Sequence, residues 1–200
     1  MILFDNPLSS NALKVRFLLA ELGIDHERRE VSMDRPRPGW YLALNPLGGI
    51  PAIDDDGFVL AESNAILRYL ALREGRVDLL PVDLTTRARL DEFIDRWTAT
   101  IRPAFYGVER PALGMGGQPV DLDTARERAE QMVGTIEILE GLISGGDTVL
   151  ETFTLADIVV APILFRTRLT PVDLGPFPKL VRLRAALTSR PSFLAADPVR

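Results

Sequence analysis

The stretch that decides the fold reads Asn45-Pro46-Leu47-Gly48-Gly49-Ile50-Pro51-Ala52-Ile53, then Asp54-Asp55-Asp56-Gly57, then Phe58-Val59-Leu60-Ala61-Glu62-Ser63-Asn64-Ala65-Ile66-Leu67-Arg68-Tyr69-Leu70. Two short apolar runs flank an acidic turn that ends in glycine, which is typical of a β-hairpin. The second run passes directly into a segment whose apolar residues recur at helical spacing. The stretch therefore predicts strand, hairpin, strand and helix in that order.

Two places in this stretch could hold a ligand. Pro51 opens the first strand, and a cis Ile50–Pro51 bond would turn the backbone of Ile50 outward, so that its N–H and C=O could pair with an extended peptide. Glu62 and Ser63 lie where the helix begins, so the free N–H groups, the helix dipole and the serine hydroxyl could hold a carboxylate, while Glu62 could hold an ammonium group. An α-amino acid head group carries this pair of charges.

The runs Asn-Pro-Leu-Gly-x-Ile-Pro (45–51) and Glu-Ser-Asn-Ala-Ile-Leu-Arg-Tyr-Leu (62–70) resemble the glutathione-binding half of the cytosolic glutathione transferase family. The family's ligand is a γ-glutamyl tripeptide. The resemblance implies that Ile50 pairs with the cysteinyl backbone, that Glu62 binds the γ-glutamyl ammonium, and that Ser63 binds the γ-glutamyl carboxylate. The same motifs would also serve a thioredoxin-like domain without a ligand.

The preceding residues complete a domain around the hairpin. Short apolar or β-branched runs predict two strands, and cap residues followed by apolar periodicity and Gly23 predict a helix between them. The predicted elements are a strand at 2–4, a helix from Ser9-Ser10-Asn11 to Gly23, a strand at 28–32 and a short irregular helix at 36–44. With the hairpin and the next helix, the order βαβαββα is that of a thioredoxin-like domain, and the resemblance implies the same.

Only helices are predicted from Thr85 onward, at 85–106, 122–144, 154–168 and 178–188. Pro103 should kink or end the first of them, and the glycine-rich residues 111–119 should form a flexible connection. The predicted fold class is α/β plus all-α. It comprises a thioredoxin-like glutathione-binding domain at 1–75, a linker at 76–84 and an all-helical domain with the electrophile pocket at 85–200.

A capping box is predicted at Thr154-Leu155-Ala156-Asp157, with Phe153 and Ile158 placed as the hydrophobic staple across it. The box matches the buried core helix of the family, which the resemblance implies is a folding element. Asp157 is therefore interpreted as a structural residue.

Composition narrows the function classes. Hydrophobic residues make up 46% of the chain, which allows a sizeable core, and the net charge of −5 disfavours nucleic acid and anionic membrane surfaces as partners. There is no Cys, so disulfides and cysteine-based redox mechanisms are excluded, and a reactive thiol would have to arrive with the ligand. No run reaches the ~18 apolar residues of a membrane span, and we expect a cytoplasmic location.

Glutathione transferases stabilise the bound thiolate with a hydrogen bond at the start of the first helix. This chemistry needs a donor beside positive partial charge, and Ser9 is the first candidate. Ser9 precedes Ala12 by three residues, so the pair occupies the positions of a Cys-x-x-Cys motif, and serine-type transferases carry their hydroxyl at the first. Ser10 is the next candidate, and Asn11 could donate through its amide. All three could instead simply cap the helix.

Other candidate binding residues follow from the family pattern. Many relatives have a basic residue for the glycyl carboxylate where this chain has Gly49, and Arg35 or Arg37 could replace it or be solvated. Trp40, in the short irregular helix expected over the ligand side, is a further candidate binding residue. In the helical half, Arg102, Tyr106 and Trp97 could line the pocket for the electrophile, although the spacing of Trp97 also suits the core. The lone His26 and the turn Asp54-Asp55-Asp56 predict neither catalysis nor a metal site, and no metal is expected.

The sequence thus predicts an enzyme that conjugates the thiolate of glutathione, as co-substrate, to a small hydrophobic electrophile. The alternative is a protein of the same fold that binds a ligand or a partner without turnover. The resemblance also implies a homodimer with contacts through the helix at 62–72 and the helix from residue 85.

Overall fold

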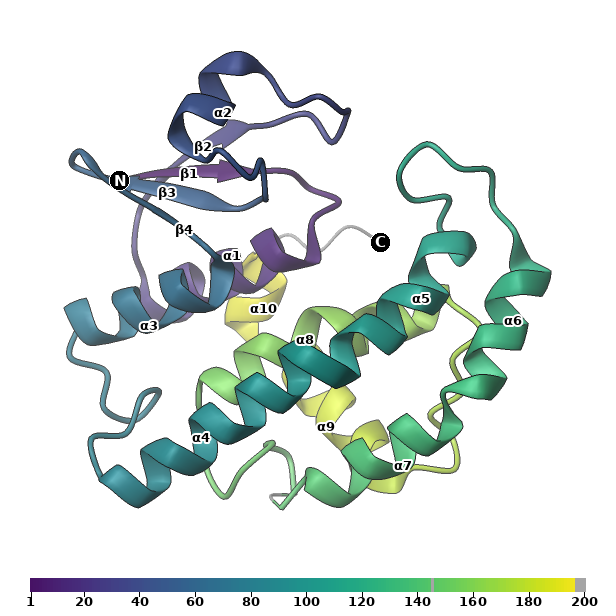
Figure 1. The fold of residues 1–200 in the computed structure, drawn as a ribbon. Helices are drawn as coiled ribbons and strands as arrows, with labels where there is room; N and C mark the ends of the chain where they lie inside the picture. The colour runs from purple at the N-terminus through teal and green to yellow at the C-terminus, as the bar shows by residue number, and fades with distance from the viewer. Residues whose placement is uncertain (145, 197–200) are drawn as a thin grey trace. The chain divides into compact units, whose positions relative to one another are not determined.

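The computed structural model describes residues 1–144 and 146–196 (Figure 1). The chain forms two compact units, one comprising Met1–Val77 together with α10 (Pro191–Ala195), the other Asp78–Ser189. The sequence analysis assigned α10 to the helical domain without recognising it as a helix. Its place in the first unit has a local reason, because Phe193 is fully buried and packs edge-on against Phe17, with ring centroids 5.2 Å apart.

The first unit has the predicted order βαβαββα, which confirms the thioredoxin-like fold. Its elements are β1 (Ile2–Asp5), α1 (Ser10–Leu22), β2 (Glu27–Glu30), α2 (Gly39–Leu44), β3 (Ala52–Asp55), β4 (Phe58–Ala61) and α3 (Ser63–Arg73). The sheet order is β2-β1-β3-β4, with β1 parallel to β2 and antiparallel to β3. Helices α1 and α3 lie together below the sheet in Figure 1, and α2 lies above it.

The core of the sheet's α2 side joins residues far apart in sequence. Phe4, Ala12, Val31, Tyr41, Ile50 and Ala52 form one buried cluster. β2, by contrast, is an edge strand whose four residues, Glu-Arg-Arg-Glu, are all exposed. The sequence placed this strand at 28–32, because an edge strand without a buried face gives no alternation to mark its ends.

The acidic turn of the hairpin makes contacts both within the turn and with α3. Asp54 does act as a turn residue, since its Oδ1 accepts from the Gly57 N–H at 2.7 Å. Asp55, however, accepts at Oδ2 from the Tyr69 hydroxyl at 2.7 Å and from Arg73 Nη1 at 2.6 Å. The hydrogen bond from Tyr69, followed by that from Arg73, lowers the pKa of Asp55. This carboxylate therefore ties the hairpin to α3.

The second unit is helical, and two of its predicted helices are divided. Its elements are α4 (Leu84–Arg96), a π-helix (Trp97–Ile101), α5 (Arg102–Ala112), α6 (Leu122–Gln131), α7 (Val133–Leu142), α8 (Leu155–Arg166), a 3₁₀-helix (Thr167–Leu169) and α9 (Pro178–Thr188). Pro103 does not end the first predicted helix, because the chain stays helical on both sides of it. It follows the π-helical turn at the start of α5, where the absence of its N–H is accommodated.

The predicted helix 122–144 breaks at Met132, between α6 and α7. Val133, Gly134 and Thr135 follow the break, and all three are weak helix formers. The glycine-rich connection begins later than predicted, because Pro111 still lies within α5. Trp97 is 2% exposed and belongs to the core, the second of the two roles considered for it.

The capping box before α8 is present as predicted. Asp157 is fully buried, and its Oδ2 accepts from the Thr154 N–H at 2.8 Å while its Oδ1 accepts from the Val149 N–H at 2.7 Å. The second bond reaches beyond the helix. Asp157 therefore fixes the segment before α8 as well as the helix start, which agrees with a structural role.

Within residues 1–144 and 146–196, no helix is long and apolar enough to cross a membrane.

Candidate active site

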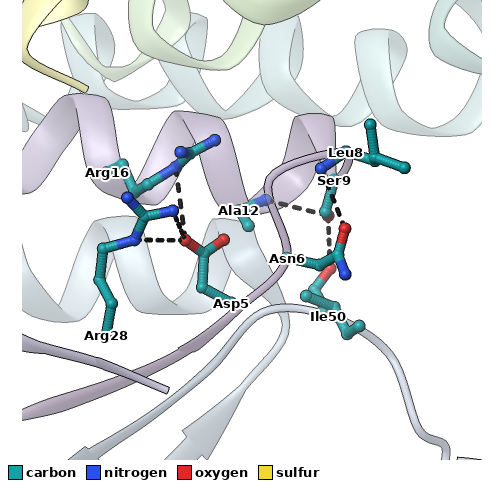
Figure 2. A network of polar contacts seen from close by, with 8 residues as sticks. All are labelled: Asp5, Asn6, Leu8, Ser9, Ala12, Arg16, Arg28 and Ile50. Atoms are coloured by element: carbon teal, nitrogen blue, oxygen red, sulfur yellow. Dashed lines mark hydrogen bonds and ion pairs between the residues drawn. The ribbon is translucent and has the colours of Figure 1, made fainter. Parts of the chain in front are cut away.

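Ser9 lies between the end of β1 and the first turn of α1. Its Oγ accepts from the Ala12 N–H at 3.2 Å and so caps the helix, and its hydroxyl donates to the Ile50 carbonyl at 3.2 Å (Figure 2). The side chain is 8% exposed. The fold thus brings the first candidate hydroxyl into contact with the residue expected to pair with a peptide ligand.

Asn6, which the sequence analysis missed, shapes the loop that carries Ser9. Its amide donates to the Val31 carbonyl at 2.9 Å, its Oδ1 accepts from the Leu8 N–H at 2.9 Å, and its own carbonyl accepts from the Ser9 N–H at 2.9 Å. An Asn two residues before a turn N–H is a recognisable Asx-turn signal. The three bonds fix the backbone around Ser9.

An ion cluster holds the other end of this region (Figure 2). Arg28 of β2 donates to Asp5 Oδ2 through Nε at 2.8 Å and Nη2 at 2.7 Å, and Arg16 of α1 places Nε 3.6 Å from the same oxygen. Asp5 and Arg16 are buried. The cluster joins β1, β2 and α1, the three elements around the Ser9 loop.

The other two candidates at this helix start are placed differently. Ser10 is the first residue of α1 and is buried, whereas Asn11 is exposed. Ser9 donates its hydroxyl to the carbonyl of Ile50, the residue expected to pair with a ligand. The geometry therefore favours Ser9 as the hydroxyl beside a ligand.

The backbone before Pro51 is held open for pairing. The Ile50–Pro51 bond is cis, as expected. The Gly49 carbonyl accepts from the Tyr41 hydroxyl and from Asn45 Nδ2, the latter at 2.8 Å, and burial raises the pKa of Tyr41. Within the described chain, the Ile50 N–H donates no hydrogen bond. A fixed chain with an open N–H suits an extended peptide ligand.

The start of α3 lacks a side-chain cap. Ser9, Asp83, Asp121 and Thr154 cap α1, α4, α6 and α8, but Glu62 makes no such bond at α3. Ser63 is 8% exposed, and the buried Lys14 donates from Nζ to Asn64 Oδ1 at 2.6 Å. Positive charge and helix N–H groups thus meet at this end of α3, which is the environment that a carboxylate requires.

Glu62 adopts a backbone conformation unusual for a residue with a side chain, with φ 66° and ψ 105°. Such strain costs on the order of 1–3 kcal/mol and is concentrated at functional sites.

We expect Glu62→Gly to raise the free energy of unfolding by about 1 kcal/mol, because glycine relieves the clash at positive φ. Chemical denaturation measures this change. Glu62→Ala is the matched control, since it removes the carboxylate but retains the Cβ, and it should leave stability near that of the wild type. A lower free energy of unfolding for Glu62→Gly than for the wild type would show that the backbone at Glu62 is not strained.

The two arginines considered for the glycyl carboxylate have separate roles. Arg37 is buried, and its guanidinium donates to the carbonyls of Gly48 at 3.1 Å, Ser32 at 2.6 Å and Asp34 at 3.1 Å. Desolvation lowers the pKa of Arg37. Arg35 is exposed, and in the described chain its guanidinium has no hydrogen-bond or ion-pair partner. Arg37 therefore builds the loop, and Arg35 is left as the candidate for the ligand.

Substitution of these arginines should separate stability from binding. We expect Arg37→Ala to lower the free energy of unfolding by about 2–3 kcal/mol, because one buried and two partly buried hydrogen bonds to backbone carbonyls are lost. Arg35→Ala should change stability by less than about 0.5 kcal/mol and weaken glutathione binding severalfold. Denaturation and calorimetry on both variants test this. Equal stability losses would refute the division of roles.

Trp40, a candidate for the ligand side, and the electrophile candidates Arg102 and Tyr106 belong to different units of the chain. Trp40, 46% exposed, stacks near Phe4 in the first unit, with ring centroids 5.9 Å apart. In the second unit, the Arg102 guanidinium lies 5.4 Å from the centroid of the Tyr106 ring. A groove of about 620 Å³ along α4 and residues 142–154 includes neither Arg102 nor Tyr106 in its lining.

Arg102 belongs to a buried charge cluster that the sequence did not reveal. Its Nη2 lies 2.9 Å from Glu109 Oε2, and Glu109 and Arg166 are buried. Burial raises the pKa of Glu109, and the charges of Arg102 and Arg166 oppose that rise. Two guanidiniums thus face one carboxylate inside the helical unit. Arg102 and Glu109 are seven residues apart, about two helical turns, and this spacing places them on one face of α5.

The Nδ1 of His26 lies 3.1 Å from the carbonyl of Ile24, a backbone contact that gives this histidine no catalytic partner. No group of three or more His, Cys, Asp or Glu residues that could hold a metal ion occurs in the described part of the chain.

The fold and the site define a thioredoxin-like domain in which, within the described chain, the Ile50 N–H is open and the start of α3 has no side-chain cap. Comparison with known proteins gives the family. Residues 8–73 match the glutathione S-transferase N-terminal domain and residues 123–194 the glutathione S-transferase C-terminal domain. The chain belongs to the glutathione S-transferase family.

Three known proteins illustrate what the chain is similar to. Glutathione S-transferase 3 of Zea mays is 32% identical over 96% of this chain and 90% of its own length. The probable maleylacetoacetate isomerase of Caenorhabditis elegans is 28% identical over 98% and 92%. A solved structure of maleyl pyruvate isomerase, described as a bacterial glutathione S-transferase of the Zeta class, superposes with a TM-score of 0.80 at 25% identity, covering 99% of this chain and 97% of its own.

Proposed function

We propose that this protein binds glutathione and uses its thiolate to attack a small electrophile. The observation that carries the proposal is the contact of the Ser9 hydroxyl with the Ile50 carbonyl, beside the open Ile50 N–H. A tripeptide paired with Ile50 would hold its cysteinyl side chain near Ser9. Hydrogen bonding and the positive end of α1 both favour the charged form of sulfur.

The remaining contacts follow from the charges of the tripeptide. The γ-glutamyl carboxylate would meet Ser63 and the uncapped start of α3, and the γ-glutamyl ammonium would meet Glu62. The exposed Arg35 guanidinium would meet the glycyl carboxylate. Held in this way, the thiolate is present at high effective concentration for a bound electrophile. Arg102 and Tyr106 are the residues of the helical unit that we propose for contact with that electrophile.

The reaction that we propose first is conjugation. The sulfur lone pair forms a bond to an electrophilic carbon. It either displaces a leaving group, which departs with the bonding electron pair, or adds to an activated double bond, whose electron pair then takes a proton from solvent, and the thioether product leaves. The proton of the thiol goes to solvent before attack.

Isomerisation is a second candidate, favoured by the relatives named as maleylacetoacetate and maleyl pyruvate isomerases. The first step is the same addition of sulfur to a double bond. Rotation about the resulting single bond and expulsion of the thiolate then return glutathione unchanged. Mass spectrometry separates the two reactions, since conjugation consumes glutathione and isomerisation does not.

The test of the proposed function is calorimetry with glutathione on the wild type, on Glu62→Ala and on Glu130→Ala. Glu130 is an exposed residue of α6 and serves as the matched control. The wild type and Glu130→Ala should bind equally, and Glu62→Ala should bind about 10–100-fold more weakly, as expected for loss of one charged hydrogen bond. If no form binds at millimolar glutathione, the alternative of a partner-binding protein without turnover takes its place.

A further inference from the structure

The Ser9 hydroxyl has a single proton, and the proposed function gives this proton two acceptors: the Ile50 carbonyl and the thiolate of the ligand. In the structure, the proton is donated to the Ile50 carbonyl at 3.2 Å, and the oxygen accepts from the Ala12 N–H. A hydroxyl donates only one hydrogen bond. Ser9 therefore cannot stabilise a thiolate until it leaves the Ile50 carbonyl.

The free-energy cost of breaking the hydrogen bond between Ser9 and the Ile50 carbonyl depends on whether the ligand supplies another donor to that carbonyl. Ile50 is 9% exposed and Ser9 is 8% exposed, so this carbonyl lies in a largely dry region. Within the described chain, its only side-chain donor is Ser9. A buried acceptor that loses its donor is strongly disfavoured. A ligand residue that pairs with Ile50 in the antiparallel manner accepts from the Ile50 N–H and donates its own N–H to the Ile50 carbonyl.

We propose that the amide N–H of the ligand's cysteinyl residue releases Ser9 for catalysis. By donating to the Ile50 carbonyl, the ligand replaces the serine hydroxyl there, and the hydroxyl turns to the sulfur of the same ligand residue. Thiol activation is thus coupled to peptide pairing. This inference rests on the proposed function, because it takes glutathione as the ligand.

The proton balance of this exchange is simple. The ligand thiol loses its proton to solvent and keeps the electron pair on sulfur. Ser9 keeps its own proton throughout and only changes the acceptor. No covalent bond to the protein forms or breaks.

The proposal sets a rule for thiol selection. A thiol without a properly placed amide leaves Ser9 at Ile50, and it gains only the general effect of the α1 N-terminus. The protein would therefore discriminate against small thiols at the ionisation step, in addition to binding them weakly. Asn6 and Asn45 support this arrangement, because they fix the loops that carry the two exchanging groups.

The test compares glutathione with its depsipeptide analogue, in which an ester oxygen replaces the cysteinyl N–H. The pKa of each bound thiol is measured by thiolate absorbance at saturating ligand, so that differences in affinity do not enter. With the wild type, we expect the thiol of the analogue to titrate about one pH unit higher than that of glutathione, a tenfold difference in the ratio of thiolate to thiol. Equal pKa values would overturn the proposal.

Two variants identify Ser9 as the group that moves. In Ser9→Ala, the two ligands should show the same thiol pKa, and in Ser9→Thr, which keeps the hydroxyl, the difference should persist. A difference that persists in Ser9→Ala would overturn the role of Ser9. If the Ser9 hydroxyl lowers the pKa of the bound thiol equally in glutathione and in the analogue, the ligand N–H does not release Ser9 from the Ile50 carbonyl. The proposed function then stands without this coupling. If glutathione does not bind at all, both fail.

Discussion

Ser9→Ala should lower kcat/KM for the glutathione-dependent reaction by about 10²–10³-fold, the usual effect of removing one hydrogen-bond donor to a developing or bound anion. The structure gives the reason, because Ser9 is the hydroxyl of this helix start that contacts Ile50. Glutathione affinity should change far less, since the contacts of α3 remain. Steady-state kinetics with separate kcat and KM values checks this result.

A second variant of Ser9 and a variant of the neighbouring Ser10 serve as controls. Ser9→Thr retains donor and cap and should recover most of the activity. Ser10→Ala should cause a much smaller loss than Ser9→Ala. Ser9→Ala also removes a helix cap, which costs about 1 kcal/mol, so both variants are compared well below their unfolding temperatures. Equal, small losses for Ser9→Ala and Ser10→Ala would refute the assignment of the activating hydroxyl.

The sequence was sufficient for the parts of the fold that local rules determine. The hairpin turn at Gly57, the caps at Ser9 and Thr154 and the αL residue Gly23 each require a residue type at a fixed position, and all lie where they were predicted. The same holds for Ser63 at the start of α3. These signals involve few neighbouring residues, so one sequence suffices to find them.

Contacts over long sequence distances could not be predicted in this way. The burial of Arg37 under three carbonyls depends on the path of the loop from 32 to 48, and the placement of α10 depends on Phe17. Arg35 and Arg37 are two residues apart and chemically identical, yet one builds the loop and the other is exposed. Spacing carries no information on which arginine turns inward.

Asp157→Ala should lower the free energy of unfolding by about 3–5 kcal/mol at neutral pH, which is a large share of the 5–15 kcal/mol typical of a domain. The carboxylate is fully buried and accepts from the N–H groups of Val149 and Thr154. Its removal leaves both donors without an acceptor and a cavity beside them. Chemical denaturation measures the loss.

Asp157→Asn is the matched variant, because it keeps the size of the side chain. Either orientation of the amide turns its NH₂ group toward one of the two backbone N–H groups, so this variant should lose about 1–3 kcal/mol. A loss below about 0.5 kcal/mol in Asp157→Ala would show that the box does not hold α8.

The same carboxylate should make stability depend on pH. Burial, opposed by the hydrogen bonds from Thr154 and Val149, raises the pKa of Asp157 from 3.8 to about 6. The folded protein therefore binds this proton more tightly than the unfolded chain between these values, and stability rises as the pH falls through 6 toward 4. The shift of about 2 units corresponds to about 3 kcal/mol.

This dependence is isolated by subtracting Asp157→Asn, which cannot titrate, from the wild type at each pH. The advantage of the wild type over Asp157→Asn should grow from pH 7 to pH 4.5 and level off below 4. An advantage that is constant, or that grows toward neutral pH, would mean that the two backbone N–H groups outweigh desolvation and keep this carboxylate charged in the folded protein.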